Sequence, residues 1–289
     1  MTLLILCRFV HFASLMLAFG ASAYLWLCAR EGLRQALAPN ASRLVAAAAV
    51  AAFLSAILWL LAETASMADD WRAAFDPGTI GAVLADTEFG RVWVWRLILA
   101  GAFLAVVIAL TNRWPAIALM SGLLLASLAL VGHAAMRTGA WGEFQRMNQA
   151  VHLLTAGAWI GGLFGFIGSL RAYSDEKLRR DAVSAMARFS FMGQFVVAAL
   201  VVTGAVNIAL VSDHAPIPPT TPYRALLCAK IALVALMIAL AATNRFFLAP
   251  KLATRPEAQA YLRATAAAEV ALGTAAVALV SVFALLDPA

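Results

Sequence analysis

Eight long runs of apolar residues constrain the fold of this chain more than any other feature. They cover approximately residues 3–28, 44–66, 92–111, 114–136, 148–170, 189–211, 224–247 and 264–286. At about 1.5 Å per residue, each run can cross the roughly 30 Å hydrocarbon core of a bilayer as an α-helix. Transmembrane β-strands would be far shorter and would alternate in hydrophobicity. We therefore predict an all-α integral membrane protein with eight transmembrane helices. A composition of 64% hydrophobic and 12% charged residues agrees with that class.

The first apolar run resembles a signal peptide in one respect, because it ends in the small residues Ala21-Ser22-Ala23. No basic segment precedes the run, and Arg8 and His11 interrupt its apolar core. A cleavable signal peptide has a basic first region and an uninterrupted apolar one. We therefore expect the run to remain in the protein as its first transmembrane helix.

The positions of lysine and arginine predict how the helices are oriented. Most cations follow the first, third, fifth and seventh runs: Arg30, Arg34, Arg43, Arg113, Arg171, Lys177, Arg179, Arg180, Arg188, Arg245, Lys251, Arg255 and Arg263. The longest connection on the other side is acidic, with Asp69, Asp70, Asp76, Asp86 and Glu88. Because cytoplasmic loops are rich in Lys and Arg, we expect both termini on the outer face, which is the periplasm if the source is a Gram-negative bacterium. The same rule explains the net charge of +6, so the expected partner is the lipid bilayer and no nucleic acid.

The chain shows signs of an internal repeat. Residues 10–14 (VHFAS) resemble residues 151–155 (VHLLT), and a glycine follows each histidine nine positions later, at Gly20 and Gly161. Two parallel four-helix repeats would have the same topology and would be related by an axis along the membrane normal. Chance similarity between apolar helices is the alternative. The predicted halves are roughly residues 1–136 and 147–289 of a single membrane domain, 1–289.

All 4 histidines fall near the outer face predicted for the membrane. His11 lies about 12 Å inside the first run, and His152 lies about one turn inside the fifth. Methionines accompany them, and imidazole with thioether suits copper, Cu(I) in particular. Core filling is the alternative role for the methionines. The candidate metal ligands are His11, His152, His133, Met136, Met147 and His214.

Charged residues inside the predicted spans are further candidates. Arg96 and Lys230 occupy corresponding positions in the third and seventh runs. An unpaired cation there is expensive, so each either reaches toward the outer headgroups or lines an outer vestibule. Glu269 lies near the cytoplasmic end of the last run, and we expect it to pair with Arg245 or Lys251.

Several short motifs occur in a particular order along the chain. They are Arg8-Phe9-Val10-His11, His152 followed by Trp159-Ile160-Gly161-Gly162-Leu163, Thr203-Gly204-Ala205-Val206-Asn207, Tyr223 with Lys230, Thr243-Asn244-Arg245 and Pro250. In order and spacing they resemble the bacterial copper-resistance membrane proteins of the CopD/PcoD family. The resemblance covers most of the chain and is strongest between His152 and Pro250. It implies a copper-homeostasis protein that moves copper across the inner membrane with a periplasmic copper-binding partner of the CopC type, supplied as a separate chain.

The sequence contains no G-x-x-x-x-G-K-[ST] loop that would bind a nucleotide. Transport would therefore be passive or coupled to an ion gradient, and we expect no enzymatic activity. The sequence leaves open whether the protein forms a homo-oligomer.

Two other functions fit the same residues. His11 and His152 on facing helices could be the axial ligands of haem b in a membrane electron-transfer protein. A haem site has no need of the outer methionines, which argues against this alternative. The third reading is a protein that hands copper to an oxidase without transporting it.

Overall fold

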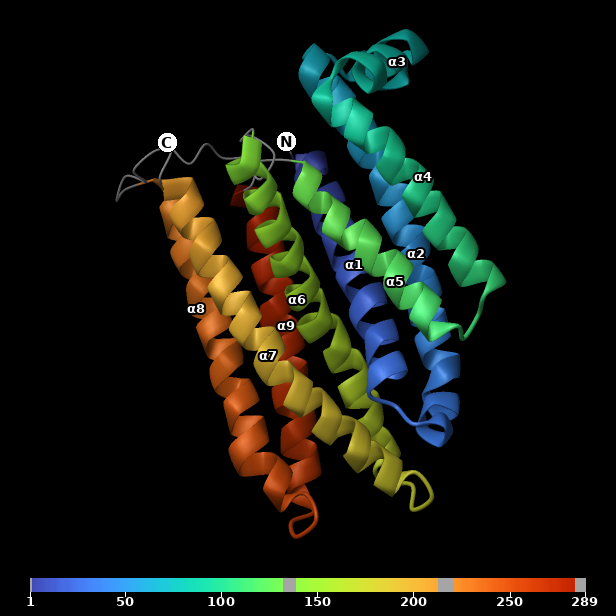
Figure 1. The fold of residues 1–289 in the computed structure, drawn as a ribbon, viewed down its shortest axis with the longest axis vertical. Coiled ribbons are helices and arrows are strands. Elements are labelled where there is room, and N and C mark those ends of the chain that lie inside the picture. Colours follow the sequence, from blue (N-terminus) through green and yellow to red (C-terminus); the bar gives the residue numbers. More distant parts are fainter. Residues whose placement is uncertain (1, 132–138, 213–220, 284–289) are drawn as a thin grey trace.

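The computed structural model describes residues 2–131, 139–212 and 221–283, which contain helices and no strand. The long helices lie side by side in an elongated bundle (Figure 1). In chain order the elements are α1 (Thr2–Leu27), α2 (Glu31–Ala68), η1 (Trp71–Phe75), α3 (Pro77–Asp86), α4 (Glu88–Ala109), α5 (Trp114–Ala126), η2 (Ser127–Leu130), α6 (Gly139–Ala172), α7 (Arg179–Ser212), α8 (Pro222–Thr243), η4 (Asn244–Leu248), η5 (Ala249–Lys251) and α9 (Glu257–Phe283).

Within the described residues, 7 helices are long and apolar enough to cross a membrane: α1, α2, α4, α6, α7, α8 with its continuation, and α9. The predicted span at 114–136 corresponds to a shorter apolar helix, Trp114–Leu130, made of α5 and η2. From its 13 α-helical and 4 3-10 residues, its length is about 28 Å, which is close to the thickness of the hydrocarbon core. The all-α prediction is confirmed, with seven helices of full spanning length and this shorter one.

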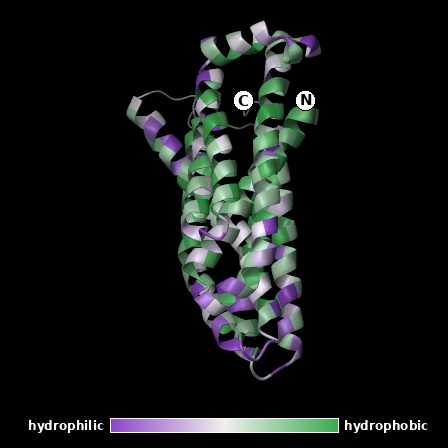
Figure 2. Ribbon diagram, turned by 90° about the vertical axis from the view of Figure 1, so that its right-hand side faces the viewer, coloured by the Kyte–Doolittle hydropathy of each residue, from purple (hydrophilic) through white to green (hydrophobic). Residues whose placement is uncertain are grey.

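The connections divide the bundle into two ends, which we call the basic end and the acidic end. The basic end carries the turns that follow α1, α4 and α6 and the one that precedes α9, with Arg30, Arg113, Lys177 and Lys251 among their residues. At the acidic end α1 begins, α9 ends, and η1 and α3 project beyond the bundle (Figure 1). Hydrophilic residues gather at the basic end, and the middle of the bundle is largely hydrophobic (Figure 2).

Capping side chains build the projection at the acidic end. Asp76 precedes α3 and accepts hydrogen bonds from the Thr79 hydroxyl at 2.6 Å and the Thr79 backbone N–H at 2.8 Å. These two bonds hold the pKa of the Asp76 carboxyl below its usual range, so it stays ionised. Pro77 at the first helical position is already in a helical conformation. A short helix therefore forms at this point, between the spans α2 and α4.

Helices α1 and α6 pack closely against each other through glycines. A β-carbon added at Gly20 would lie 2.3 Å from the carbonyl oxygen of Gly157 and 2.5 Å from the α-carbon of Gly161. One added at Gly161 would lie 2.1 Å from the carbonyl oxygen of Met16. No side chain fits in such a space, so the two backbones are in direct contact. Small residues allow this close approach between helices in membranes.

The contacts between α1 and α6 follow one register. Gly20 lies against Gly161 and Tyr24 lies against Gly165, so each contact joins residues that are 141 positions apart. The two histidines of the predicted repeat, at positions 11 and 152, are separated by the same 141 positions. Residue numbers rise together along both helices, so α1 and α6 run parallel and touch at positions that correspond in the predicted repeat.

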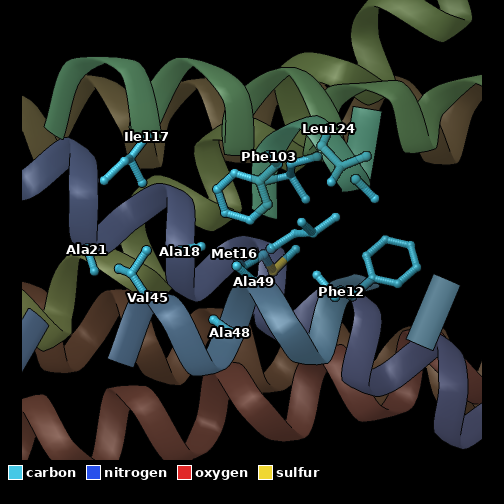
Figure 3. Close-up of a cluster of buried hydrophobic side chains, with 14 of the residues drawn as sticks. Phe12, Met16, Ala18, Ala21, Val45, Ala48, Ala49, Phe103, Ile117 and Leu124 are labelled. Carbon is cyan, nitrogen blue, oxygen red and sulfur yellow. The ribbon is translucent and has the colours of Figure 1, made fainter. Parts of the chain in front are cut away.

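The other helices pack around these two. The first helix group consists of α1, α2, α4 and α5, in which α1 and α4 each contact α2 and α5. The second helix group consists of α6, α7, α8 and α9, in which α6 contacts α7 and α9, and α8 contacts α9. The core of the first helix group is drawn in Figure 3, where Phe12 and Met16 of α1 lie among Ala49 of α2, Phe103 of α4 and Leu124 of α5. The second helix group has a smaller core around Trp159, Leu200 and Met237.

The glycine contact predicts a difference between two substitutions of the same type. Gly161→Ala should lower the free energy of unfolding by about 1–3 kcal/mol, because the new methyl group overpacks the α1–α6 contact. Gly193→Ala in α7 should leave stability unchanged or raise it by up to about 1 kcal/mol, since nothing lies within 4 Å of its β-carbon and alanine favours the helix. Thermal unfolding of the purified variants in detergent measures both, and equal effects would contradict the packing described.

Candidate functional site

His11 lies on α1 with no exposed surface and has partners on both ring nitrogens. Its Nδ1 lies 3.0 Å from the Ala52 carbonyl oxygen and 3.1 Å from the Ser55 hydroxyl, and its Nε2 lies 2.7 Å from Arg96 Nη2. Because a guanidinium can only donate, Nε2 accepts and the ring hydrogen is on Nδ1, which donates to Ala52. His11 therefore has no free lone pair for a metal ion unless Arg96 moves away.

Arg96 lies on α4 and is only 2% exposed. Its Nη1 donates to the Leu124 carbonyl at 3.2 Å and to the Ser127 hydroxyl, and the guanidinium lies 5.0 Å from the centre of the Trp93 ring. Its Nε has no partner, and no carboxylate of the described residues lies within 4 Å of it. Arg96 thus points inward, and neutral acceptors and an aromatic ring support its charge.

Aromatic rings enclose the His11–Arg96 pair. The Trp59 ring meets the imidazole edge-on at 5.8 Å, and the Trp93 ring lies 6.2 Å away. Toward the acidic end, the Arg8 guanidinium lies 5.0 Å over Trp59 and interacts electrostatically with Glu63. The surroundings of His11 are therefore closed, and its role in this arrangement is to accept a hydrogen bond from a buried cation.

His152 on α6 has a different environment, because only its Nδ1 has a hydrogen-bond partner among the described residues. Its Nδ1 lies 3.0 Å from the Thr203 hydroxyl. That hydroxyl donates its own hydrogen to the Ala199 carbonyl at 2.6 Å, so Thr203 accepts from Nδ1–H and Nε2 carries the lone pair. Nε2 forms no hydrogen bond within the part of the chain that the structure describes. His152 is half-buried, whereas His11 has no exposed surface.

Polar side chains surround the Thr203 contact. Asn148 Nδ2 donates to the Thr203 carbonyl at 3.0 Å and to Asn207 Oδ1 at 2.9 Å, and Asn207 Nδ2 donates to Gln149 Oε1 at 2.8 Å. The charge of Lys230 on α8 acts on His152. The second helix group therefore carries a membrane-embedded polar site to which α6, α7 and α8 all contribute.

The structure does not bring His11 and His152 together. Each histidine lies nine residues before the glycine of the α1–α6 contact, and nine residues at 100° each amount to about two and a half turns, which places the histidine on the opposite face. The contacts agree, because His11 bonds to α2 and α4 while His152 bonds to α7. A haem held between these two imidazoles would need them to converge, and they point into separate helix groups.

Of the other predicted ligands, the structure describes only Met147. Met147 lies on α6 near the acidic end and is 69% exposed. His133, Met136 and His214 lie outside the described residues. Within residues 2–131, 139–212 and 221–283, no group of three or more His, Cys, Asp or Glu side chains could hold a metal ion. Coordination by the full predicted set stays a prediction.

Several residues of these sites did not stand out in the sequence. Ser55, Asn148 and Gln149 were not singled out, and Thr203 and Asn207 were noted only as part of a motif. The sequence did contain a signal for them, namely the spacing of the polar residues. Asn148 and His152 on α6 are four positions apart, as are Thr203 and Asn207 on α7, so each pair shares one face of its helix. Polar pairs with this spacing in apolar helices point to a site between the helices.

Two family models match this chain, one at its N-terminal half and one at its C-terminal part. Residues 1–143 match the family model for the copper resistance protein D-like N-terminal domain, and residues 183–283 match the model for copper resistance protein D. No solved structure matches the chain. Together with the helices long enough to span, these matches define a multi-pass bacterial inner membrane protein related to copper.

The relatives extend over nearly the full length. The chain is 33% identical to the inner membrane protein YebZ of Escherichia coli (strain K12) over 97% of both chains. It is 32% identical to copper resistance protein D of Pseudomonas syringae pv. tomato, over 84% of this chain and 81% of the relative. It is 27% identical to copper transport protein CutJ of Bacillus subtilis (strain 168), over 88% of this chain and 47% of that protein. The chain belongs to the copper resistance protein D (CopD) family.

The two histidines should differ in their importance for folding. His11→Ala should lower the free energy of unfolding by about 2–4 kcal/mol, because it leaves a cavity and removes an acceptor from the buried Arg96. His152→Ala should lower it by less than half as much, since the half-buried ring makes one hydrogen bond. Thermal unfolding in detergent compares the two, and a larger loss for His152→Ala would contradict these environments.

Proposed function

We propose that this protein binds copper on the acidic side of the second helix group and moves it across the inner membrane. The observation that carries the proposal is the free Nε2 of His152 inside a membrane-embedded polar site. The names of two relatives, copper resistance protein D and copper transport protein CutJ, support copper as the substrate. The excess of Lys and Arg at the basic end supports placing that end in the cytoplasm and both termini in the periplasm.

His152 has the features of a metal ligand. Its Nδ1–H is held by Thr203, which fixes the tautomer and leaves Nε2 unprotonated. Metal-binding histidines usually have their second nitrogen held in this way, and losing that partner weakens metal binding. His11 joins the site only if Arg96 releases its Nε2. We therefore assign His11 and Arg96 to the structural support of the first helix group.

The charge of Lys230 favours Cu(I) over Cu(II) at this site. Lys230 lies near enough to act on His152, and the repulsion between two cations scales with their charges, so a divalent ion is penalised about twice as much as a monovalent one. The remaining proposed ligands are His133, Met136, Met147 and His214. Their thioethers and imidazoles suit Cu(I) as well. A periplasmic protein of the CopC type would deliver the ion to this end.

The route across the membrane follows the second helix group. His152 and Trp159 are seven positions apart on α6 and therefore share a face, about 10 Å apart along the axis. Lys230 and Met237 on α8 and Asn244 at the start of η4 repeat the same spacing. Met237 is 2% exposed and belongs to the same hydrophobic cluster as Trp159, where its sulfur is a soft ligand that copper would pass. The backbone contact between α1 and α6 leaves no space between these two helices where Gly20 meets Gly161.

The proposed function also depends on how the spans are arranged in the predicted repeat. We propose eight spans in two parallel four-helix repeats, with the short helix Trp114–Leu130 as the fourth span. The polar site of the first repeat is occupied by Arg96 and supports the fold, and that of the second repeat is open and binds the ion. The protein then acts as a transporter rather than as an enzyme.

A Cu(I) titration of the purified protein tests the proposal. His152→Ala should weaken Cu(I) binding at least about tenfold, because it removes a direct ligand, and Thr203→Val should weaken it less, because it only frees the ring. Competition with a chromogenic Cu(I) chelator gives the affinities. Thr155→Val, one turn further along α6, is the matched control and should bind like the wild type. Unchanged affinity in His152→Ala would remove this residue from the site.

A further inference from the structure

A cavity of about 740 Å³ lies in the second helix group toward the basic end. Its walls are formed by the last turns of α1, the middle of α6, the first half of α7, the end of α8, the turns η4 and η5, and α9. Most of the lining is apolar, with Leu163, Phe166 and Val197 among its residues. The copper site proposed above does not include it. The volume is ample for several water molecules beside a polar group.

The wall of this cavity carries one buried carboxylate, Glu269 of α9, which is 2% exposed. Its Oε2 accepts a hydrogen bond from Trp159 Nε1 at 3.1 Å, and its Oε1 accepts one from Asn244 Nδ2 at 2.7 Å. The Thr265 hydroxyl donates to Asn244 Oδ1 and so fixes which way the amide points. The network is therefore oriented, with each donor directed toward the carboxylate.

A π-helical turn places one of these donors. The α-helical hydrogen bonding of α8 ends at Thr243, and Asn244–Leu248 forms the π-helix η4. In this turn Asn244 reaches Glu269, while Arg245 Nη1 donates to the Ser190 carbonyl at 2.7 Å and to its hydroxyl at 2.9 Å. Such turns are rare and often occur at functional sites. The ion pair expected between Glu269 and Arg245 or Lys251 is not formed.

No cation neutralises Glu269 within the described part of the chain. Its carboxylate makes no ion pair at 4 Å or less. The other titratable or charged groups that line the cavity are Tyr24 and Cys28 from α1 and Arg245 from η4, while α6 and α7 contribute none. The Tyr24 hydroxyl is bonded to Ser169, and Arg245 is bonded to Ser190. An isolated anion inside a membrane is expensive, so an ion that cancels its charge binds favourably.

We propose that Glu269 is a reversible proton-binding site that couples copper movement to the proton gradient. The inference rests on the proposed transport function. When the cavity holds no metal, a carboxylate oxygen of Glu269 takes a proton from water at the basic end. When Cu(I) arrives from the acidic end past Met237, the carboxyl group releases its proton toward that end and the carboxylate charge balances the ion, so one proton moves out for each Cu(I) that moves in. No electron is transferred in this exchange.

The hydrogen bonds suggest how the exchange follows movement of the helices. Trp159 belongs to α6 and Asn244 to the π-turn after α8, so the two donors come from different elements on either side of the cavity. A shift of α8 away from α9 breaks the Asn244 bond and removes one of two interactions that stabilise the ionised carboxylate. Opening of the cavity and proton binding are thereby linked.

Infrared spectroscopy tests the proton site without any copper. On lowering the pH, the wild-type protein should gain a carbonyl band from a protonated, buried carboxyl group, and Glu269→Gln should lack it. Glu269→Asp keeps a carboxyl group at this position and should show a shifted band, which guards against loss of folding in the first variant. Glu257→Gln, an exposed residue of the same helix, is the control and should keep the wild-type band. A band that persists in Glu269→Gln, or its absence from the wild type, would overturn the proposal.

Copper uptake into proteoliposomes tests the coupling. The rate of Cu(I) uptake by the wild type should change severalfold when a pH gradient is imposed. The rate of uptake by Glu269→Gln should be the same with and without the gradient. An equal response of both proteins would overturn the coupling. If the wild type takes up no copper, the proposed transport function fails, while the infrared band still decides whether Glu269 binds a proton.

Discussion

The backbone contact of α1 with α6 is the constraint on which the placement of the buried polar groups depends. Gly20 and Gly161 let the two helices touch without intervening side chains. Since each histidine precedes its glycine by nine residues, the contact turns both imidazoles outward, away from each other. The two imidazoles must then find partners within their own helix groups. The protein consequently has two separate polar sites instead of one at its centre.

The two sites meet the same physical requirement in different ways. A polar group removed from water is stable only if its hydrogen bonds are made. In the first helix group, Arg96 donates a hydrogen bond to Nε2 of His11 and donates others to a backbone carbonyl and a hydroxyl. No nitrogen of His11 is then left to bind a ligand. In the second helix group, Thr203 accepts a hydrogen bond from Nδ1 of His152, and Nε2 has no partner among residues 2–131, 139–212 and 221–283. Because only the histidine of the second helix group has an unoccupied nitrogen among the described residues, we propose that copper binds in that group.

Much of the fold could be predicted from the sequence because the bilayer fixes the length and composition of a span. The apolar runs predicted the helices, and the cation pattern predicted which connections share one end. The family inferred from short motifs is confirmed. The short helix α3 was missed, since its ten residues depend on the local caps at Asp76 and Pro77 rather than on a long apolar pattern.

The site was predictable only to the level of residue types. Histidines at one depth suggested a shared ion, but depth along a helix does not say which face a side chain occupies. The nine-residue spacing from His11 to Gly20 contained that information once the glycine was known to be the contact point. The partners of His152 and Glu269 depend on how α7, η4 and α9 are packed, and no pattern within a single helix reveals it.

The central claim is that His152, and not His11, offers its imidazole to copper. X-ray absorption spectroscopy of the Cu(I)-loaded protein tests it most directly, because scattering from the outer atoms of an imidazole ring identifies a bound histidine. The account predicts that the imidazole contribution of the His11→Ala protein equals that of the wild type, whereas that of the His152→Ala protein is smaller by one ring. An undiminished contribution in His152→Ala, or a loss in His11→Ala, would contradict it.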